Sequence, residues 1–255
     1  MTEYKSRLVK ELCDQLKNMP EVLAIWEGGS AATGFEDECS DLDLTIVTGG
    51  KNGDLIFAIL DSLLDSQHGI ARRFRVPEPS WHGMSQCVYL LQDSPEFFYC
   101  DICTVEKDNP HKLSENDRHG KARIHYDPQG LCVDSLTDPA ELQTIARRVW
   151  DSATAVDFIF ETELAKALHR GNYIDCASIY HTFLQRCLIP LMNLKHRPTK
   201  ADFGLRYIPR EYPQNAIDEV DTLLRLGSLE ELKTKALHML SMYQEIKQEL
   251  QPKFQ

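Results

Sequence analysis

The stretch that decides the fold spans residues 22–47 and reads VLAIWEGGSAATGFEDECSDLDLTIV. Two short apolar runs flank a Gly-Gly-Ser turn and an acidic loop. Apolar runs of this length, bounded by Gly or Pro, are typical of buried strands. We therefore expect a strand over residues 22–26, a turn that starts at Gly28, and a second strand over residues 41–47.

The second strand carries two carboxylates. Alternate residues on a strand share a face, so Asp41, Asp43 and Thr45 are expected to point one way and the leucines between them into a core. Two carboxylates a few ångströms apart repel each other unless a cation lies between them. Mg²⁺ prefers oxygen ligands and keeps room for phosphate oxygens, which makes it the natural partner.

A third carboxylate is expected from a later strand, residues 97–105. Asp101 lies inside this apolar run, where a charge without a partner is costly. Its rivals, Glu96 and Glu106, lie at the ends of the run and are expected to be solvated. Three carboxylates can hold two metal ions, which clamp the attacking and leaving oxygens of a displacement at phosphorus.

The Gly-Gly-Ser turn predicts a phosphate site. Gly28 and Gly29 allow the backbone to approach phosphates closely, and Ser30 can donate its hydroxyl to a phosphate oxygen. Residues 31–33 can start a short helix whose N–H groups face an anion. Either half of the motif is common by itself, but the two at this spacing, beside apolar strands and a later in-strand acid, form a specific pattern.

This pattern resembles the signature of the nucleotidyltransferase superfamily, the DNA polymerase β-like fold that includes the aminoglycoside nucleotidyltransferases. The residues that match by position are Gly29, Ser30, Asp41, Asp43 and Asp101. The resemblance implies two Mg²⁺ ions and the transfer of a nucleoside monophosphate, AMP from ATP first of all, to a hydroxyl, with release of pyrophosphate. Minimal members paired with toxin-type partners carry an Arg shortly after Gly-Ser, and residues 31–34 here contain none.

The remaining pattern predicts an α+β chain in two domains, residues 1–136 and 137–255. The first is expected to be a mixed sheet with flanking helices, as in the nucleotidyltransferase core, and the second to be all helical. Further strands are predicted over 71–76, 87–91 and 123–126, and helices over 2–18, from Asp54 to Gly69, 138–169, 172–188, 216–226 and 229–250. Cap residues are expected at Asp138, before Pro139, and at Ser228, with Glu231 completing a capping box.

Composition narrows the functional classes. The chain has 255 residues, a net charge of −11, and no apolar run long enough to cross a membrane. We expect a cytoplasmic protein without a membrane partner, and the acidity argues against extended nucleic acid and against DNA polymerisation. Nine acidic residues and one basic residue lie between Glu27 and Asp65, which favours a metal ion, a cationic substrate such as an aminoglycoside, or both. Solubility alone is expected to explain the outlying acids Asp54, Asp61 and Asp65.

The eight cysteines are expected to be reduced thiols, since nothing at the N-terminus reads as an export signal. Cys100 and Cys103 form a C-x-x-C pattern, but residues three apart on a strand face opposite sides, and no second Cys or His pair completes a zinc site.

Two further sets of residues are candidates in the helical half. Asp157 and Glu161 lie four apart on one helix, and either could take the proton of the acceptor hydroxyl; the alternative is a solvated helix face. A basic cluster could clamp the triphosphate, with Tyr207 stacking on a base, or be an ordinary surface loop; it comprises Lys195, His196, Arg197, Lys200 and Arg206.

Three functions remain open. The first is nucleotidyl transfer to a hydroxyl of a small molecule. The second is the same chemistry on a protein side chain, as in an antitoxin or a regulator. The third is a nucleotide-binding module without turnover, against which the three retained carboxylates argue. The acceptor, the choice of nucleotide and the oligomeric state cannot be read from these residues.

Overall fold

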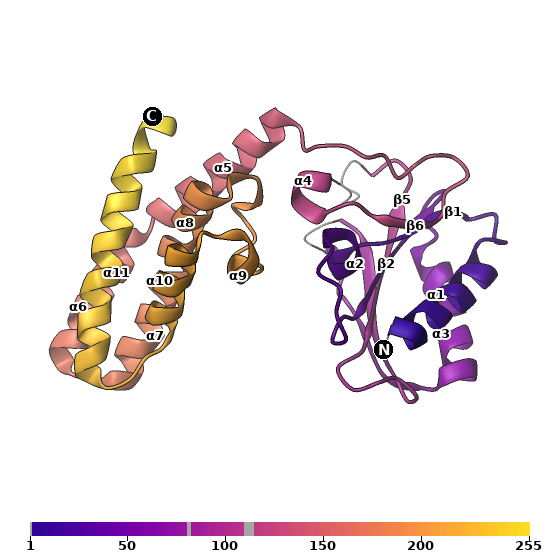
Figure 1. Ribbon diagram of the computed structural model, residues 1–255, viewed down its shortest axis with the longest axis horizontal. Helices are drawn as coiled ribbons and strands as arrows, with labels where there is room; N and C mark the ends of the chain where they lie inside the picture. The colour runs from indigo at the N-terminus through magenta and orange to yellow at the C-terminus, as the bar shows by residue number, and fades with distance from the viewer. Residues whose placement is uncertain (1, 81–82, 110–114) are drawn as a thin grey trace. The chain divides into compact units, whose positions relative to one another are not determined.

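The computed structural model describes residues 2–80, 83–109 and 115–255 (Figure 1). The chain divides into two compact units, Met1–Leu136 and Thr137–Gln255. The division falls where the pattern of the sequence changes from mixed strands and helices to helices alone. Residues 110–114 lie outside the described residues, and the short helix α4, Asn116–His119, follows them.

The N-terminal unit contains a six-stranded mixed sheet in the order β3-β4-β5-β2-β1-β6. Strands β2 and β5 are parallel, and all other neighbours are antiparallel. The strands are β1 (Val22–Glu27), β2 (Leu42–Thr48), β3 (Ile70–Arg75), β4 (Ser85–Leu91), β5 (Cys100–Glu106) and β6 (Arg123–Tyr126). Six strands lie where six were predicted, but β2 begins one residue after Asp41, and β5 begins at Cys100, three residues after its predicted start.

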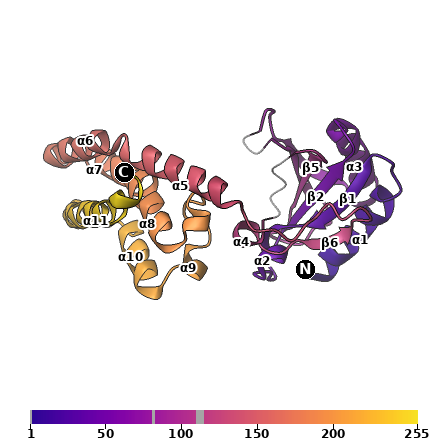
Figure 2. The ribbon, with the colours of Figure 1, turned by 90° about the horizontal axis from the view of Figure 1, so that it is seen from above.

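The two faces of this sheet have different cores. Helices α1 (Thr2–Leu16) and α3 (Gly53–His68) cover one face, where Leu8, Leu12 and Leu60 pack against Leu44 and other strand residues. Figure 2 shows both helices on the same side of the sheet. A smaller core on the other face contains Trp26, Val47, Met84 and Val105. The short helix α2 (Gly29–Thr33) contacts β2 and α4.

The C-terminal unit is helical around one buried core. Its helices are α5 (Pro139–Thr154), α6 (Asp157–Arg170), α7 (Tyr173–Phe183), a π-helical turn (Leu184–Leu188), α8 (Ile189–His196), α9 (Ile208–Glu211), α10 (Gln214–Leu224) and α11 (Leu229–Leu250), with short 3₁₀ turns at Pro198–Lys200 and Gln251–Lys253. The predicted caps are confirmed: the Ala140 N–H donates to Asp138 at 2.7 Å, and the Ser228–Glu231 capping box has both of its hydrogen bonds. In the described parts of both units, no helix is both long and apolar enough to cross a membrane.

Two helix boundaries differ from the sequence prediction. The single helix expected over 138–169 breaks after Thr154, and α6 restarts at Asp157, whose side chain accepts from the Phe158 N–H at 2.7 Å. The helix expected over 172–188 does not end there but continues into α8 through a π turn, in which the Ile189 N–H bonds to the Leu184 carbonyl. Pro190 lacks an N–H, and a position at the start of α8 requires none.

Candidate active site

Asp43 and Asp101 lie side by side on the two central parallel strands. Asp43 on β2 is the direct register partner of Asp101 on β5. Both are half-buried, whereas their neighbours Leu42, Leu44 and Ile102 are buried in the core under α1 and α3. The two carboxylates therefore share the opposite face, as the alternation predicted. Glu96 and Glu106, the rivals of Asp101, are exposed.

The Gly-Gly-Ser turn packs directly on the Asp43 carboxylate. The Gly28 N–H donates to the Asp43 carbonyl at 2.9 Å. Gly29 has a φ of +53°, and a Cβ added to it would lie 1.7 Å from Asp43 Oδ2. Only glycine fits this position, because the backbone is left-handed and the carboxylate occupies the space of a side chain.

Ser30, the next residue, has a buried hydroxyl oxygen that finds no hydrogen-bond partner in the part of the chain that the structure describes. A buried hydroxyl without a partner costs free energy, and such groups are rare in folded proteins. The predicted role of Ser30 is to donate to a phosphate oxygen, and its position directly after Gly29, which packs on Asp43, is compatible with that role.

Asp41 lies just before β2, and a tyrosine contacts its side chain. Tyr99 directly precedes β5, the strand that neighbours β2. Interaction with the Asp41 carboxylate and burial raise the pKa of the Tyr99 hydroxyl, and the negative charges of Asp43 and Asp101 raise it further. All three predicted ligands thus act electrostatically on one hydroxyl group, which is evidence that they lie near one another.

Asp101 is held by a neighbouring strand. The Gln86 side-chain amide on β4 lies 2.7 Å from both carboxylate oxygens of Asp101. Among residues 2–80, 83–109 and 115–255, no three His, Cys, Asp or Glu side chains are close enough together to hold a metal ion as they stand. The metal site stays a prediction, and it requires the Asp101 carboxylate to share its oxygens between Gln86 and the ion.

Cys100 and Cys103 face opposite sides of β5, as predicted. Cys100 belongs to the core under α1 and α3, while Cys103 packs against the core of the other face. Burial raises the pKa of the Cys103 thiol, and the charges of Asp101 and Asp43 add to this effect. A thiol whose pKa is raised is a poor nucleophile at neutral pH.

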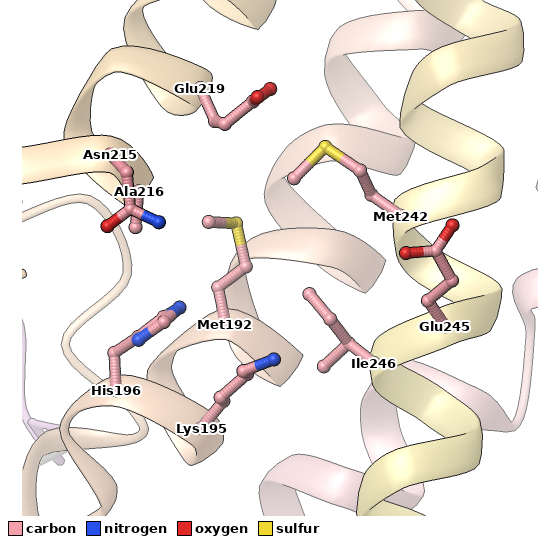
Figure 3. A pocket seen from close by; sticks show the side chains of 9 residues that line it. All are labelled: Met192, Lys195, His196, Asn215, Ala216, Glu219, Met242, Glu245 and Ile246. Atoms are coloured by element: carbon pink, nitrogen blue, oxygen red, sulfur yellow. The ribbon is translucent and has the colours of Figure 1, made fainter. Parts of the chain in front are cut away.

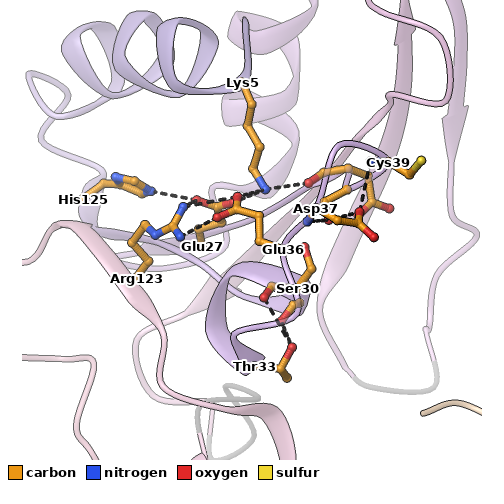
Figure 4. Close-up of polar contacts among 12 residues, drawn as sticks. Lys5, Glu27, Ser30, Thr33, Glu36, Asp37, Cys39, Arg123 and His125 are labelled. Carbon is orange, nitrogen blue, oxygen red and sulfur yellow. Dashed lines mark hydrogen bonds and ion pairs between the residues drawn. The ribbon is translucent and has the colours of Figure 1, made fainter. Parts of the chain in front are cut away.

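A charge cluster around the buried residues Lys5 and Glu27 lies at the end of the sheet beside this site (Figure 4). Lys5 of α1 pairs with Glu27 Oε1 at 2.5 Å and with Glu36 Oε1 at 2.9 Å. Arg123 of β6 pairs with the second oxygens of the same two carboxylates, at 3.3 Å and 2.7 Å, and His125 Nε2 lies 3.4 Å from Glu27 Oε2. The hydrogen bond from Arg123, supported by Lys5, lowers the pKa of Glu36 to about 2.

These pairs change the interpretation of the acidic stretch. Glu27 and Glu36 are neutralised by Lys5 and Arg123, which lie outside it. Asp54, expected to serve solubility alone, pairs with Arg75 at 3.2 Å, and Asp61, expected likewise, pairs with Arg73 and accepts from the Tyr89 hydroxyl at 2.9 Å. Part of the negative charge is therefore structural, and it says less about a cationic acceptor than the sequence suggested.

The basic cluster of the C-terminal unit is largely paired. Lys195 binds Glu249 at 2.6 Å, and Lys200 binds Glu211. Arg206 lies against the Tyr207 ring and donates to its hydroxyl at 3.0 Å. The triphosphate clamp remains a prediction, in which Lys195 and Lys200 must first leave their glutamate partners.

A cavity of about 240 Å³ lies within the C-terminal unit, between α8, α10 and α11 (Figure 3). Its lining combines apolar and charged side chains, namely Met192, Lys195, His196, Asn215, Ala216, Glu219, Met242, Glu245 and Ile246. Burial, together with the charge of Lys195, lowers the pKa of His196, so this ring is neutral at pH 7. Two glutamates in the wall make the cavity a poor fit for a triphosphate.

The two proposed general bases are engaged between helices. Asp157 is buried, accepts from the Tyr243 hydroxyl at 2.7 Å and pairs with Lys247. Glu161 accepts from the Gln244 side chain at 2.8 Å. Burial raises the pKa of Asp157, but the bonds from Lys247 and Tyr243 outweigh it, so the pKa is lowered. These contacts favour a structural role for Asp157 in joining α6 to α11, and catalysis by either residue stays a hypothesis.

Sequence reasoning missed Lys5, Gln86 and Tyr99. A signal existed for Lys5, because it lies three and four residues before Leu8 and Val9 and so falls on the apolar face of α1. Gln86 and Tyr99 lie in or beside predicted strands, but their partners are distant in sequence. Periodicity carries no information about such pairs.

No protein-family model and no curated protein matches the chain. The case for a function therefore rests on the geometry of the N-terminal unit and on the motif.

Gly29→Ala tests how tightly the turn fits Asp43. We expect the free energy of unfolding to fall by about 1–2 kcal/mol because of the left-handed backbone alone. We also expect the proposed nucleotidyl transfer to be slower by about tenfold or more, because the added Cβ displaces the Asp43 carboxylate. Gly34→Ala is the matched control, since Gly34 has a φ of +74° but open space around its Cβ. Equal losses of activity in the two variants, measured beside urea unfolding, would contradict the fit.

Proposed function

We propose that this protein is a metal-dependent nucleotidyltransferase, which transfers a nucleoside monophosphate, AMP from ATP first of all, to a hydroxyl of a small molecule. The observation that carries the proposal is the surroundings of Asp43. Its carboxylate lies against Gly29 and beside its register partner Asp101, and the residue after Gly29 is Ser30, whose buried hydroxyl finds no partner among the described residues.

The chemistry of the donors suits a divalent cation, and the described carboxylates must move closer together to hold one. Asp43 and Asp101 are like charges on neighbouring strands, an arrangement that is unfavourable without a compensating charge. The Ser30 hydroxyl lacks an acceptor in the described residues. A metal–nucleotide complex suits both groups, because the cation binds carboxylate oxygens and a phosphate oxygen accepts the hydroxyl. Mg²⁺, when bound by Asp41, Asp43 and Asp101, supplies positive charge against the phosphoryl oxygens.

The chain's own residues then bind and orient. Gly28 and Gly29 present backbone without side chains to the phosphates, and Ser30 donates to one of them. Tyr99 orients Asp41, and Gln86 orients Asp101. The oxygen of the acceptor forms the new bond to the α-phosphorus, and the bond to pyrophosphate breaks.

The deciding experiment measures pyrophosphate release by the wild-type protein with Mg²⁺ and each nucleoside triphosphate. The acceptors form a panel of alcohols with and without amino groups. We expect release that requires one acceptor class and that Asp41→Ala abolishes. Labelling of a protein band from labelled ATP would move the acceptor to a protein side chain. Binding of no nucleotide by the wild type, or undiminished release by Asp41→Ala, would overturn the proposal.

A further inference from the structure

Lys5 is a buried lysine with three oxygen partners around its ammonium group. Its side chain is 5% exposed. It forms ion pairs with the carboxylates of Glu27 and Glu36. It also donates a hydrogen bond to the main-chain carbonyl of Asp41 at 2.7 Å. The three acceptors come from the end of β1, the loop after α2 and the residue before β2.

The loop between α2 and β2 is thereby held at two points. Its middle is ordered by local bonds, since Asp37 accepts from the Cys39 N–H at 3.0 Å and from the Ser40 hydroxyl at 2.9 Å. Its two ends, Glu36 and Asp41, are both bonded to Lys5. Figure 4 shows Lys5 reaching this loop from α1.

Arg123 distinguishes two roles that Lys5 could have, namely neutralising the glutamates and fixing the main chain of Asp41. It binds the same two glutamates as Lys5, Glu27 and Glu36. Within the described ranges, however, the side chain that bonds to the Asp41 carbonyl is Lys5. Glu27 pairs with Leu44 across the β1–β2 ladder, and Leu44 belongs to the core under α1 and α3. The charge cluster thus lies on the sheet face opposite the Asp43 side chain. Its contact with the site is the hydrogen bond from Lys5 to the main-chain carbonyl of Asp41.

We propose that Lys5 is a positioning residue, which fixes the main chain of Asp41 from helix α1 and so sets where the Asp41 carboxylate lies in the site. This inference rests on the proposed function, because it takes Asp41 as a ligand for nucleotidyl transfer. Lys5 touches neither substrate nor metal and acts through Asp41. Partners that orient metal ligands in this way typically contribute 10- to 100-fold to metal affinity or activity.

The test compares Lys5→Met with Arg123→Met. We expect Lys5→Met to raise the Mg²⁺ concentration for half-maximal pyrophosphate release about tenfold or more and to lower kcat/KM by about 10- to 100-fold. Arg123→Met is expected to leave the Mg²⁺ half-saturation within about twofold of wild type, since the Asp41 contact remains. Equal shifts of the Mg²⁺ half-saturation in the two variants would overturn the proposal, because the loss of one positive charge from the cluster would then explain the shift without the contact to Asp41.

A second pair of variants covers the case in which Lys5→Met does not fold, since it leaves the buried Glu27 carboxylate with one cation fewer. Lys5→Met combined with Glu27→Gln removes both charges, and Glu27→Gln alone keeps Lys5 on Asp41. We expect the Mg²⁺ shift in the double variant only. The same shift in Glu27→Gln alone would contradict the proposal.

Hydrogen exchange separates this inference from the proposed function. We expect the amides of residues 37–42 to exchange at least about tenfold faster in Lys5→Met than in Arg123→Met. If the wild type releases no pyrophosphate with any acceptor, the proposed function fails, while the exchange result still shows whether Lys5 fixes this segment. Unchanged exchange in Lys5→Met would show that it does not.

Discussion

Asp101→Asn is expected to lower pyrophosphate release by at least about 100-fold while leaving the N-terminal unit as stable as before, or slightly more stable. The loss follows if Asp101 is a metal ligand, since transition-state charge stabilisation of this kind is typically worth 10²–10³ in rate. The gain in stability follows from the register of β2 against β5, which places Asp101 beside Asp43. Removing one of two like charges relieves about 0.2–1 kcal/mol of repulsion.

Mg²⁺ should reverse this order of stability. A ligand that binds the folded state stabilises it by RT ln(1 + [L]/Kd). Added Mg²⁺ and nucleotide are therefore expected to raise the Tm of the wild type and to leave that of Asp101→Asn unchanged. Asp54→Asn is the control, since its fully exposed side chain lies on α3. Retained activity in Asp101→Asn, or equal Tm shifts in Asp101→Asn and the wild type, would show that Asp101 is not a ligand.

Arg197→Met is expected to be the most destabilising single change in the C-terminal unit that we consider, at about 3–5 kcal/mol. The Arg197 side chain is 5% exposed and pairs with Glu211 at 2.7 Å. It also donates to Asn193 at 2.7 Å and to the carbonyls of Gly204, at 2.6 Å, and Arg206. Methionine fills the space but leaves these acceptors buried without their donor.

Hydrogen exchange of the intact chain measures this loss in the unit concerned. The slowest amides of residues 137–255 should lose protection by about 100-fold or more, since 1.4 kcal/mol corresponds to a factor of ten. Arg225→Met is the control, because Arg225 is 77% exposed and solvent screens its pair with Asp221, which therefore contributes little. A loss in Arg197→Met no larger than in Arg225→Met would mean that the buried contacts contribute little.

This role of Arg197 shows where sequence reasoning reached its limit. Composition placed Arg197 in a basic cluster with Lys195 and Lys200, and the cluster suggested a phosphate clamp. The structure pairs all three with carboxylates or carbonyls. Whether a cation is free for a ligand depends on its partners in the fold, and Glu211 and Glu249 are 14 and 54 residues away from Arg197 and Lys195.

The strands and the shared face of the carboxylates were predictable because they depend on local alternation. Leu42, Leu44 and Ile46 predicted the core side of β2, and Asp43 followed on the other side. The pairing of Asp43 with Asp101 was a hypothesis based on the motif, since it joins residues 58 positions apart in the numbering. The Lys5 contacts were missed for the same reason, although the position of Lys5 on the apolar face of α1 was visible.

The helix break near Ala155 was missed for a different reason. The apolar stripe continues from Val149 through Val156 to Phe160, and one long helix and two shorter ones produce the same stripe. The decisive contacts are those of the Asp157 side chain, which accepts from the Phe158 N–H in the first turn of α6 and reaches α11 through Tyr243. An aspartate inside a periodic stripe, able to bond to nearby backbone N–H groups, is the local signal that could have indicated the break.

The register of β2 against β5 also limits how this chain can change in length. A single residue inserted within 42–48 or 100–106 would move every later side chain to the other face of its strand. Asp43 and Asp101 would then lie on opposite sides of the sheet, although the total charge and composition would hardly change. Insertions between β3 and β4, or in the loop before Phe98, leave the Asp43–Asp101 pair intact. Natural variants of this chain are therefore expected to differ in length in those connections and to keep these two strands free of insertions and deletions.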